Sequence, residues 1–147
     1  LNLSKEKLVE IAKEIGSDVP FFIFGGTCRV LGAGEKINPI KKAVSEFFVV
    51  FRPHKRLETK KMYQLHDKTG KSFFELAKEI CPDIKIIEKK IKKFPIQEFG
   101  LSGKGLTVFC GARNYEMAEK IAACYTEFNG DIFICQPTKQ ALHITNL

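Results

Sequence analysis

The sequence predicts an α+β protein organised around a split βαβ unit, and three observations support this class. From residue 47 to residue 135 the apolar pattern runs strand, helices, strand, strand, helix, strand, which is the order of an antiparallel sheet with helices on one face. Glycine, proline and asparagine residues separate the apolar segments. Hydrophobic residues make up 44% of the 147 residues, enough for the core of one domain with a segment of a neighbouring domain.

Residues 1–43 do not fit the split βαβ plan and have the pattern of the last part of a preceding domain. Ser4 is a candidate N-cap for a helix that ends at Gly16. Asp18 is a second N-cap candidate, with Pro20 in the first turn of a short helix. The glycines in residues 32–34 then predict a hairpin between two strands, the second of which ends before Pro39. We therefore divide the chain into residues 1–43 and 44–147.

The middle of the chain predicts one strand and three helices. Residues 47–51 are β-branched and aromatic, which is typical of a strand, and Pro53 stops it. Residues 58–66 predict the first helix, and Ser72 caps a second helix that runs to residue 80. Residues 84–94 have apolar side chains at helical spacing and predict the third helix.

The last third has the most regular pattern. Two strands, over residues 96–101 and 107–110, flank a turn at residues 102–105. Asn114 caps a helix with apolar residues on one side, and residues 131–135 form the final strand. These elements complete the split βαβ order.

Composition says more about the class of protein than about the identity of its partner. With 24 Lys and Arg against 17 Asp and Glu, the net charge of +7 favours an anionic partner without identifying it. The five cysteines form no CxxC pair and leave one unpaired, which argues against zinc or a disulfide framework. Cys110, Cys124 and Cys135 lie among apolar residues, and we expect them to be small hydrophobic residues in a reducing compartment. No apolar run is long enough to span a membrane, so we expect a cytoplasmic protein.

Asp18 is the first candidate site residue, because it lies among hydrophobic residues between two helices. It can be an N-cap that accepts hydrogen bonds from backbone amides. It can also be a carboxylate that orients a hydroxyl group or accepts its proton during group transfer. Position alone favours the first interpretation, and the two are compatible.

The run Ser102, Gly103, Lys104, Gly105 is the second candidate. It can be a tight turn between antiparallel strands, in which the glycines adopt positive φ. It can also be a small phosphate loop in which amides and Lys104 approach an anion. It is not a Walker motif, which has a longer spacing. His54, in a basic loop, carries no specific signal of catalysis, and no metal cluster is evident.

Several stretches together resemble the GHMP kinase family. The stretches that resemble the family are Glu10-Ile11-Ala12, Ile15-Gly16-Ser17-Asp18-Val19-Pro20-Phe21-Phe22, Gly25-Gly26-Thr27, Gly32-Ala33-Gly34-Glu35-Lys36, Pro53 with Thr59-Lys60-Lys61-Met62-Tyr63, and Leu101-Ser102-Gly103-Lys104-Gly105 with Thr107-Val108-Phe109. The likeness extends over nearly the whole chain but corresponds only to the later part of the family sequence.

The resemblance implies a ferredoxin-like GHMP kinase C-terminal domain, preceded by the end of the N-terminal domain. It implies ATP-dependent phosphorylation, with Mg²⁺, of a cytidylyl-methylerythritol hydroxyl in the non-mevalonate route to isoprenoids. Asp18 falls on the catalytic aspartate and Thr59 on a position near the methylerythritol group. Ser102, Gly103 and Gly105 fall on the loop that packs against the main phosphate-binding loop.

Some features of the family are missing from this chain. The third motif usually has serine where Lys104 and Leu106 stand. The long phosphate loop and the N-terminal lysine that partners the aspartate are absent. Because phosphoryl transfer depends on positioning and charge stabilisation, we expect these 147 residues alone not to turn over ATP, and the missing N-terminal half to be their partner.

Two other interpretations remain open. A βαββαβ sheet with positive charge can be an RNA-binding module, using the lysines of residues 85–93, although Leu106 stands where such modules need an aromatic residue. The chain can also be a non-catalytic relic of a GHMP kinase.

Overall fold

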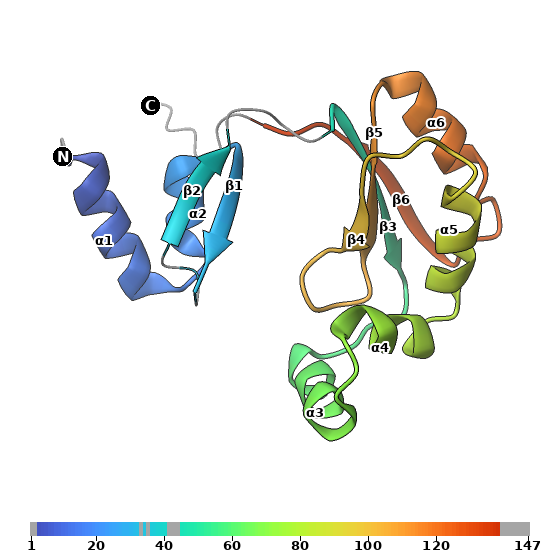
Figure 1. The fold of residues 1–147 in the computed structure, drawn as a ribbon, viewed down its shortest axis with the longest axis horizontal. Coiled ribbons are helices and arrows are strands. Elements are labelled where there is room, and N and C mark those ends of the chain that lie inside the picture. Colours follow the sequence, from blue (N-terminus) through green and yellow to red (C-terminus); the bar gives the residue numbers. More distant parts are fainter. Residues whose placement is uncertain (1–2, 33, 35, 41–44, 139–147) are drawn as a thin grey trace. The chain divides into compact units, whose positions relative to one another are not determined.

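A computed structural model describes residues 3–32, 34, 36–40 and 45–138, and its secondary structure confirms the α+β class. The chain divides into two compact units (Figure 1). Unit 1 comprises Leu1–Ala43 with Pro137–Leu147, and unit 2 comprises Val44–Gln136.

Unit 1 contains the predicted pair of helices and the hairpin. The hydroxyl of Ser4 accepts a hydrogen bond of 3.3 Å from the amide of Lys7 and so caps the first helix. The hairpin differs from the prediction in one respect, because its second strand continues through Pro39, which pairs with Cys28. A proline is tolerated there because the hairpin has only two strands, and an edge strand does not need every amide. The elements are α1 (Lys5–Ile15), α2 (Val19–Phe24), β1 (Thr27–Leu31) and β2 (Lys36–Ile40).

Unit 2 is built on a four-stranded sheet in the order β4-β5-β3-β6, with every neighbouring pair antiparallel. The first and last strands in sequence are adjacent, which is the arrangement of a split βαβ unit. The strands are β3 (Phe47–Pro53), β4 (Phe99–Leu101), β5 (Val108–Ala112) and β6 (Gly130–Cys135). β4 is shorter than the predicted strand over residues 96–101, and β3 includes Pro53 instead of stopping before it.

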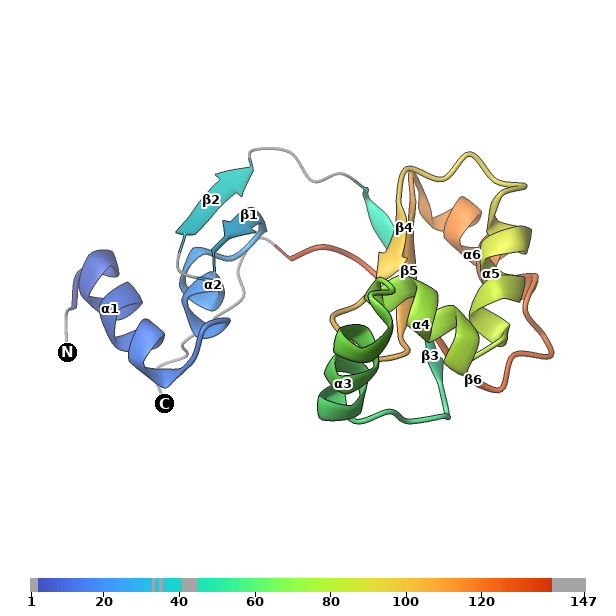
Figure 2. The ribbon, with the colours of Figure 1, turned by 60° about the horizontal axis from the view of Figure 1, so that its bottom comes forward.

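Four helices complete unit 2: α3 (Thr59–Thr69), α4 (Phe73–Ile80), α5 (Asp83–Ile91) and α6 (Tyr115–Ala123). Figure 2 shows α5 and α6 on the same side of the sheet. The side chains of Val49 and Phe51 on β3 are fully buried and belong to the same core cluster as Ile87 on α5 and Ile121 on α6. The alternation of side chains along a strand places Phe48 and neighbouring residues on the other face.

The core of the protein lies in unit 2. The cluster of buried hydrophobic side chains runs from Val49 to Tyr125 and includes no residue of unit 1. Among the described residues of unit 1, the buried hydrophobic side chains are those of Ala12 and Pro20. The apolar side of α1 is exposed, with Ile15 72% accessible. The described residues of unit 1 therefore form little core of their own.

Several details differ from the sequence predictions. Of the three cysteines that lie among apolar residues in the sequence, Cys110 is buried, whereas Cys124 and Cys135 are exposed. Cys124 follows the last turn of α6, where its thiol donates to the carbonyl of Lys120, and Cys135 ends β6. All five cysteines are free. None of the helices in the described ranges has the length and hydropathy to cross a membrane.

Candidate functional site

Asp18 lies in unit 1, at the joint between α1 and α2. It stands at the N-cap position of α2, but its side chain makes no capping hydrogen bond. The carboxylate is exposed, so the prediction that hydrophobic residues crowd against it was wrong. It also makes no hydrogen bond or ion pair with the other described residues. The carboxylate is therefore accessible to solvent or to a ligand.

The backbone beside Asp18 is held by a close approach from the hairpin. Gly34 has φ +116°, and a methyl group added to it would overlap the carbonyl oxygen of Ser17. Only glycine fits this position, because other residues rarely adopt such a φ and their Cβ has no room. The amide of Val19 donates to the carbonyl of Gly16 at 3.2 Å, which closes the turn. Two contacts thus fix the path of the chain around Asp18.

Thr59 lies in unit 2, as the first residue of α3, with an exposed side chain. Ser102, Gly103 and Gly105 lie in the loop between β4 and β5, which is closed by a hydrogen bond of 2.8 Å from the amide of Ser102 to the carbonyl of Thr107. Gly103 has φ +69°, and a Cβ at either glycine would meet no atom within 4 Å. The loop therefore presents open backbone to solvent.

Lys104 connects this loop to α3. Its ammonium lies 4.4 Å from the centroid of the Tyr63 ring and 5.7 Å from that of Phe73. Such cation–π contacts hold the lysine over the two helices instead of leaving it free above the glycines. Tyr63 lies one helical turn after Thr59, so the structure brings the glycine loop and the helix of Thr59 together. Asp18 belongs to the other unit.

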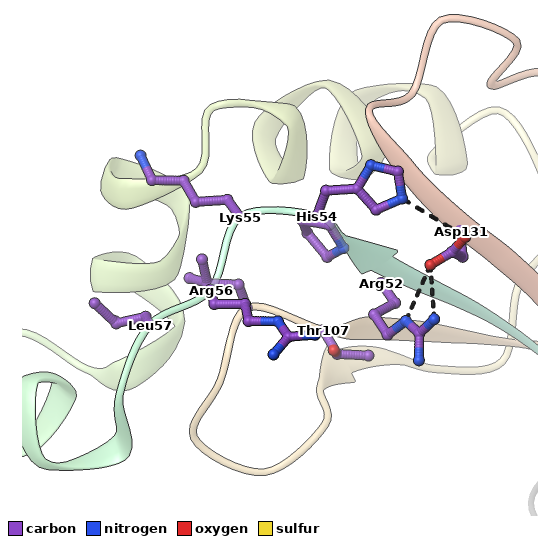
Figure 3. A pocket seen from close by; sticks show the side chains of 9 residues that line it. Arg52, His54, Lys55, Arg56, Leu57, Thr107 and Asp131 are labelled. Atoms are coloured by element: carbon purple, nitrogen blue, oxygen red, sulfur yellow. Dashed lines mark hydrogen bonds and ion pairs between the residues drawn. The ribbon is translucent and has the colours of Figure 1, made fainter.

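A basic cleft of about 370 Å³ lies at the end of β3, where β5 and β6 begin (Figure 3). Asp131 holds two of its side chains: Nε and Nη2 of Arg52 donate to Oδ2 at 3.1 and 2.8 Å, and His54 Nε2 lies 3.6 Å from Oδ1. The hydrogen bonds from Arg52 lower the pKa of Asp131 below its ordinary value. The lining residues are Arg52, Pro53, His54, Lys55, Arg56, Leu57, Leu106, Thr107 and Asp131.

Sequence reasoning identified the basic loop around His54 but not this cleft. Arg52 and Asp131 face each other because β3 and β6 pair in a register that the sequence does not reveal. Thr107 and Leu106 join them from the far end of the glycine loop. The one sequence feature that pointed to the cleft was the run of basic residues, including Lys55 and Arg56, directly after the predicted strand.

The described residues contain no group of three or more His, Cys, Asp or Glu side chains that could hold a metal ion. Mg²⁺ prefers carboxylates together with substrate phosphates. Asp18 alone provides one carboxylate, so the residues present do not form a magnesium site by themselves.

Fold and candidate residues together define an α+β protein with an exposed carboxylate at a helix joint and a glycine loop between strands. No protein-family model matches the chain. The chain is similar to proteins named 4-diphosphocytidyl-2-C-methyl-D-erythritol kinase, and the kinase resemblance inferred from its motifs is thereby confirmed. The match is to the C-terminal part of those proteins.

Three relatives illustrate the match. The protein of that name from Listeria monocytogenes serotype 4a is 28% identical over 172 residues, which cover 99% of this chain and 59% of the relative. The one from Carboxydothermus hydrogenoformans is 37% identical over 106 residues, covering 72% of this chain and 35% of the relative. The one from Clostridium botulinum is 48% identical over 62 residues, covering 42% and 22%.

The chain thus spans about 59% of the length of the Listeria relatives that it matches. The aligned stretch of 172 residues is also longer than the chain of 147, so those relatives carry additional residues inside the matched region.

Proposed function

We propose that this chain is the C-terminal part of an ATP-dependent GHMP kinase. The kinase would phosphorylate the 2-hydroxyl of 4-diphosphocytidyl-2-C-methyl-D-erythritol in the non-mevalonate synthesis of isoprenoid precursors. Residues 44–147 would be its ferredoxin-like C-terminal domain, and residues 1–43 the end of its N-terminal domain. The names of the relatives, their coverage of this chain and its antiparallel α+β sheet support the proposal.

The observation that carries the proposal is the accessible carboxylate of Asp18. A carboxylate that capped α2 would be occupied by backbone amides, whereas this one makes no capping bond. The contact between Gly34 and Ser17 fixes the backbone beside it. Asp18 would orient the substrate hydroxyl and accept its proton, Thr59 would lie near the methylerythritol group, and Ser102, Gly103 and Gly105 would support the phosphate loop.

ATP and Mg²⁺ need groups beyond those described in this chain. The exposed backbone at Gly103 and Gly105 is compatible with a supporting role near phosphates, but the long phosphate loop is absent from the sequence. A single carboxylate also does not form a magnesium site.

The exposed apolar surface of unit 1 supports the need for a partner segment. Leu8, Ile11 and Ile15 on α1 and Phe22 on α2 are between 37% and 72% accessible. Burial of such side chains is worth about 1.5–3 kcal/mol each, so an uncovered set favours association. The N-terminal half that the relatives carry would provide the covering surface.

Replacement of Asp18 by Asn in a protein restored with the N-terminal half of a relative tests the catalytic role. We expect phosphorylation of the cytidylyl substrate to fall by about 100-fold or more, as is typical for loss of a general base. Asp67→Asn, an exposed aspartate of α3, is the matched control and should retain full activity. An unchanged rate for Asp18→Asn would exclude the proposed role.

The chain alone should release no ADP from ATP in the presence of Mg²⁺ and substrate. The relevant measurement is a coupled ADP assay on the 147-residue chain, with the reconstituted protein as the positive control. If the reconstituted protein is inactive as well, while both parts are folded, the chain is better described as a non-catalytic relic.

An RNA-binding function is the second candidate, and the open face of the sheet is the observation that favours it. Phe48 and Phe109 contact each other edge to face at 5.8 Å on the face opposite the buried Val49, and Phe133 on β6 is 41% accessible. Aromatic rings on such a face can stack on bases. Binding of single-stranded RNA that weakens in Phe133→Ala and with added salt would support this candidate.

A further inference from the structure

The cleft at the end of β3 concentrates positive charge in a space of about 370 Å³. The run of residues 52–57 contributes three Lys or Arg side chains and one histidine to its lining, against the single carboxylate of Asp131. With His54 neutral, the lining has a net charge of about +2, and such concave positive surfaces attract anions. The candidate residues Asp18, Thr59, Ser102, Gly103 and Gly105 do not line this cleft.

Three of the four basic side chains are committed to neighbours. Arg52 and His54 contact Asp131, and His54 also lies 3.2 Å from Oδ1 of Asn129 through Nδ1. Lys55 donates to the carbonyl of Ile80 at 2.7 Å, at the end of α4. These contacts fix the walls of the cleft, because each side chain has a defined partner.

Arg56 is different from the other three. Its side chain is exposed and makes no hydrogen bond or ion pair within the described ranges of the chain. In Figure 3 its guanidinium points toward Thr107, whose side chain borders the same cleft. Thr107 is half-buried, and the amide of Ser102 donates to its carbonyl, which holds the backbone of Thr107 at the border of the cleft.

An uncommitted arginine beside a hydroxyl group is suited to phosphate. The planar guanidinium donates two parallel hydrogen bonds to phosphate oxygens, and a hydroxyl adds a third donor. The size of the cleft fits a small ligand, because ligand pockets begin at about 300 Å³. A nucleic acid would instead need phosphate contacts along an extended surface, and Asp131 would lie against it.

We propose that the basic cleft at the end of β3 binds a phosphate- or diphosphate-bearing small molecule. Arg56 and the hydroxyl of Thr107 would contact the phosphate oxygens, between walls fixed by the Arg52–Asp131 pair and by Lys55. The proposal does not rest on the kinase proposal, because none of the candidate residues Asp18, Thr59, Ser102, Gly103 and Gly105 lines the cleft.

Isothermal titration calorimetry of the 147-residue chain at low salt tests the site. The probes are inorganic phosphate, pyrophosphate, ATP and a short single-stranded RNA. We expect pyrophosphate and ATP to bind, and Arg56→Ala to weaken both by at least about tenfold, since it removes charge-assisted hydrogen bonds. Thr107→Val should weaken binding by a smaller factor. Equal affinities for pyrophosphate and ATP would show that the cleft recognises the diphosphate group and not the nucleoside.

Arg113→Ala is the matched control, because Arg113 is an exposed arginine beyond the other end of β5. It should leave pyrophosphate binding unchanged, and thermal melting should show that all variants are folded. The proposal is overturned if the unsubstituted chain binds neither probe, or if Arg113→Ala and Arg56→Ala weaken binding equally. RNA that binds more tightly than ATP and is insensitive to Arg56→Ala would also overturn it.

Discussion

Tyr125 illustrates how one side chain connects two elements of unit 2. It is 4% accessible, its hydroxyl donates to the carbonyl of Ile87 at 2.8 Å, and its ring lies edge to face on Phe51 at 4.7 Å. Burial raises the pKa of its phenol. The residue thus combines core packing with a hydrogen bond that joins the end of α6 to α5.

Tyr125→Phe removes this hydrogen bond and keeps the ring. We expect the free energy of unfolding to fall by about 1 kcal/mol, the usual net value of such a bond. Urea denaturation followed by circular dichroism measures the change. Tyr63→Phe is the control, because Tyr63 is 38% accessible, and it should change stability by less. Equal effects in the two variants would show that the bond to Ile87 contributes nothing.

The cysteines differ in reactivity because their surroundings differ. Burial raises the pKa of the Cys110 thiol to about 12, so its reactive thiolate is scarce at neutral pH. Cys124 and Cys135 are exposed. In the folded chain an aromatic disulfide reagent should label these two within minutes and Cys110 only after unfolding, as peptide mass spectrometry can establish. Rapid labelling of Cys110 in native buffer would contradict the buried position.

At the residue scale the sequence made Asp18 a candidate site residue but did not predict its surroundings. Its apolar neighbours along the chain suggested crowding, whereas a residue at a helix joint can point to solvent while its neighbours pack elsewhere. Lys104 is a similar case, because the sequence did not reveal that Tyr63 and Phe73 would lie within reach of its ammonium. Long-range contacts of this kind depend on packing that no local pattern specifies.

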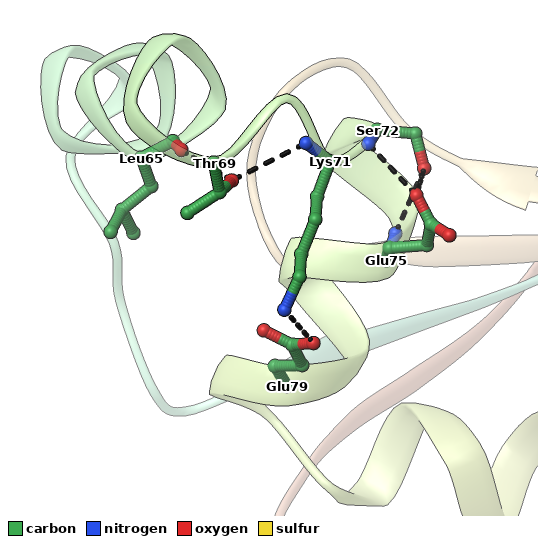
Figure 4. Close-up of polar contacts among 6 residues, drawn as sticks. All are labelled: Leu65, Thr69, Lys71, Ser72, Glu75 and Glu79. Carbon is green, nitrogen blue, oxygen red and sulfur yellow. Dashed lines mark hydrogen bonds and ion pairs between the residues drawn. The ribbon is translucent and has the colours of Figure 1, made fainter.

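At the scale of elements, α4 shows how local chemistry defines a helix start. The hydroxyl of Ser72 accepts from the amide of Glu75 at 3.3 Å, and the carboxylate of Glu75 accepts from the amide of Ser72 at 2.9 Å (Figure 4). This reciprocal pair is a capping box. Lys71 also pairs with Glu79 at 2.6 Å across the first two turns.

The capping box predicts a pH dependence. Hydrogen bonds from the side chain and backbone of Ser72 lower the pKa of Glu75 below its ordinary 4.5. A carboxyl with a lowered folded pKa stabilises the fold above its unfolded pKa, and this contribution is lost as the pH falls through the folded pKa. Glu75→Gln should therefore lower Tm at pH 7, and the deficit should shrink in acid.

Glu119→Gln provides the comparison for that measurement. Glu119 lies on the exposed side of α6 and makes no hydrogen bond or ion pair with other described residues. Its substitution should change Tm little, and by a similar amount at every pH. A deficit for Glu75→Gln that stayed constant from neutral to acid pH would show that the ionised carboxylate does not support the cap.

Helices and strands that carry a local sequence signal were predictable, but the residues at which they begin or end were less so. The caps Ser4, Ser72 and Asn114 each accept the expected amide bond, so helix starts followed from the sequence. The end of β2 did not, because whether Pro39 can pair depends on the strand opposite it. β4 begins only at Phe99, although the backbone of Gln97 and Glu98 before it also forms hydrogen bonds with Gly111 of β5.

At the scale of the whole molecule, the two units differ in self-sufficiency. Unit 2 has a contiguous core and an internal hydrogen-bonded network, as in the buried Ser45, whose hydroxyl donates to Glu98 at 2.9 Å. A methyl group at Gly111 would overlap that hydroxyl, so the backbone packs closely there. Unit 1 has few buried side chains to match its exposed apolar surface.

Separate production of the two parts tests this difference. Residues 44–136 should unfold cooperatively by calorimetry, because the core cluster is complete within them. Residues 1–43 joined to residues 137–147, which together make up unit 1, should show no cooperative transition, since ordering the backbone costs about 1–2 kcal/mol per residue and little apolar area is buried among the described residues. A sharp transition in the shorter piece, or none in the longer one, would contradict this division.

Sequence patterns predicted the split βαβ order of unit 2, because strand and helix periods differ clearly there. They did not predict the basic cleft, since Arg56, Thr107 and Asp131 come from separate strands and loops. Topology alone brings these residues together, and a single sequence does not specify strand register.

The uncovered side of α1 also has a consequence inside a cell. Chaperones and quality-control proteases bind exposed hydrophobic segments. The exposed side chains of Ile15 and Phe22 form such a segment. The lifetime of this chain would then depend on whether another protein segment covers this surface. Its abundance would report on assembly as much as on its own expression.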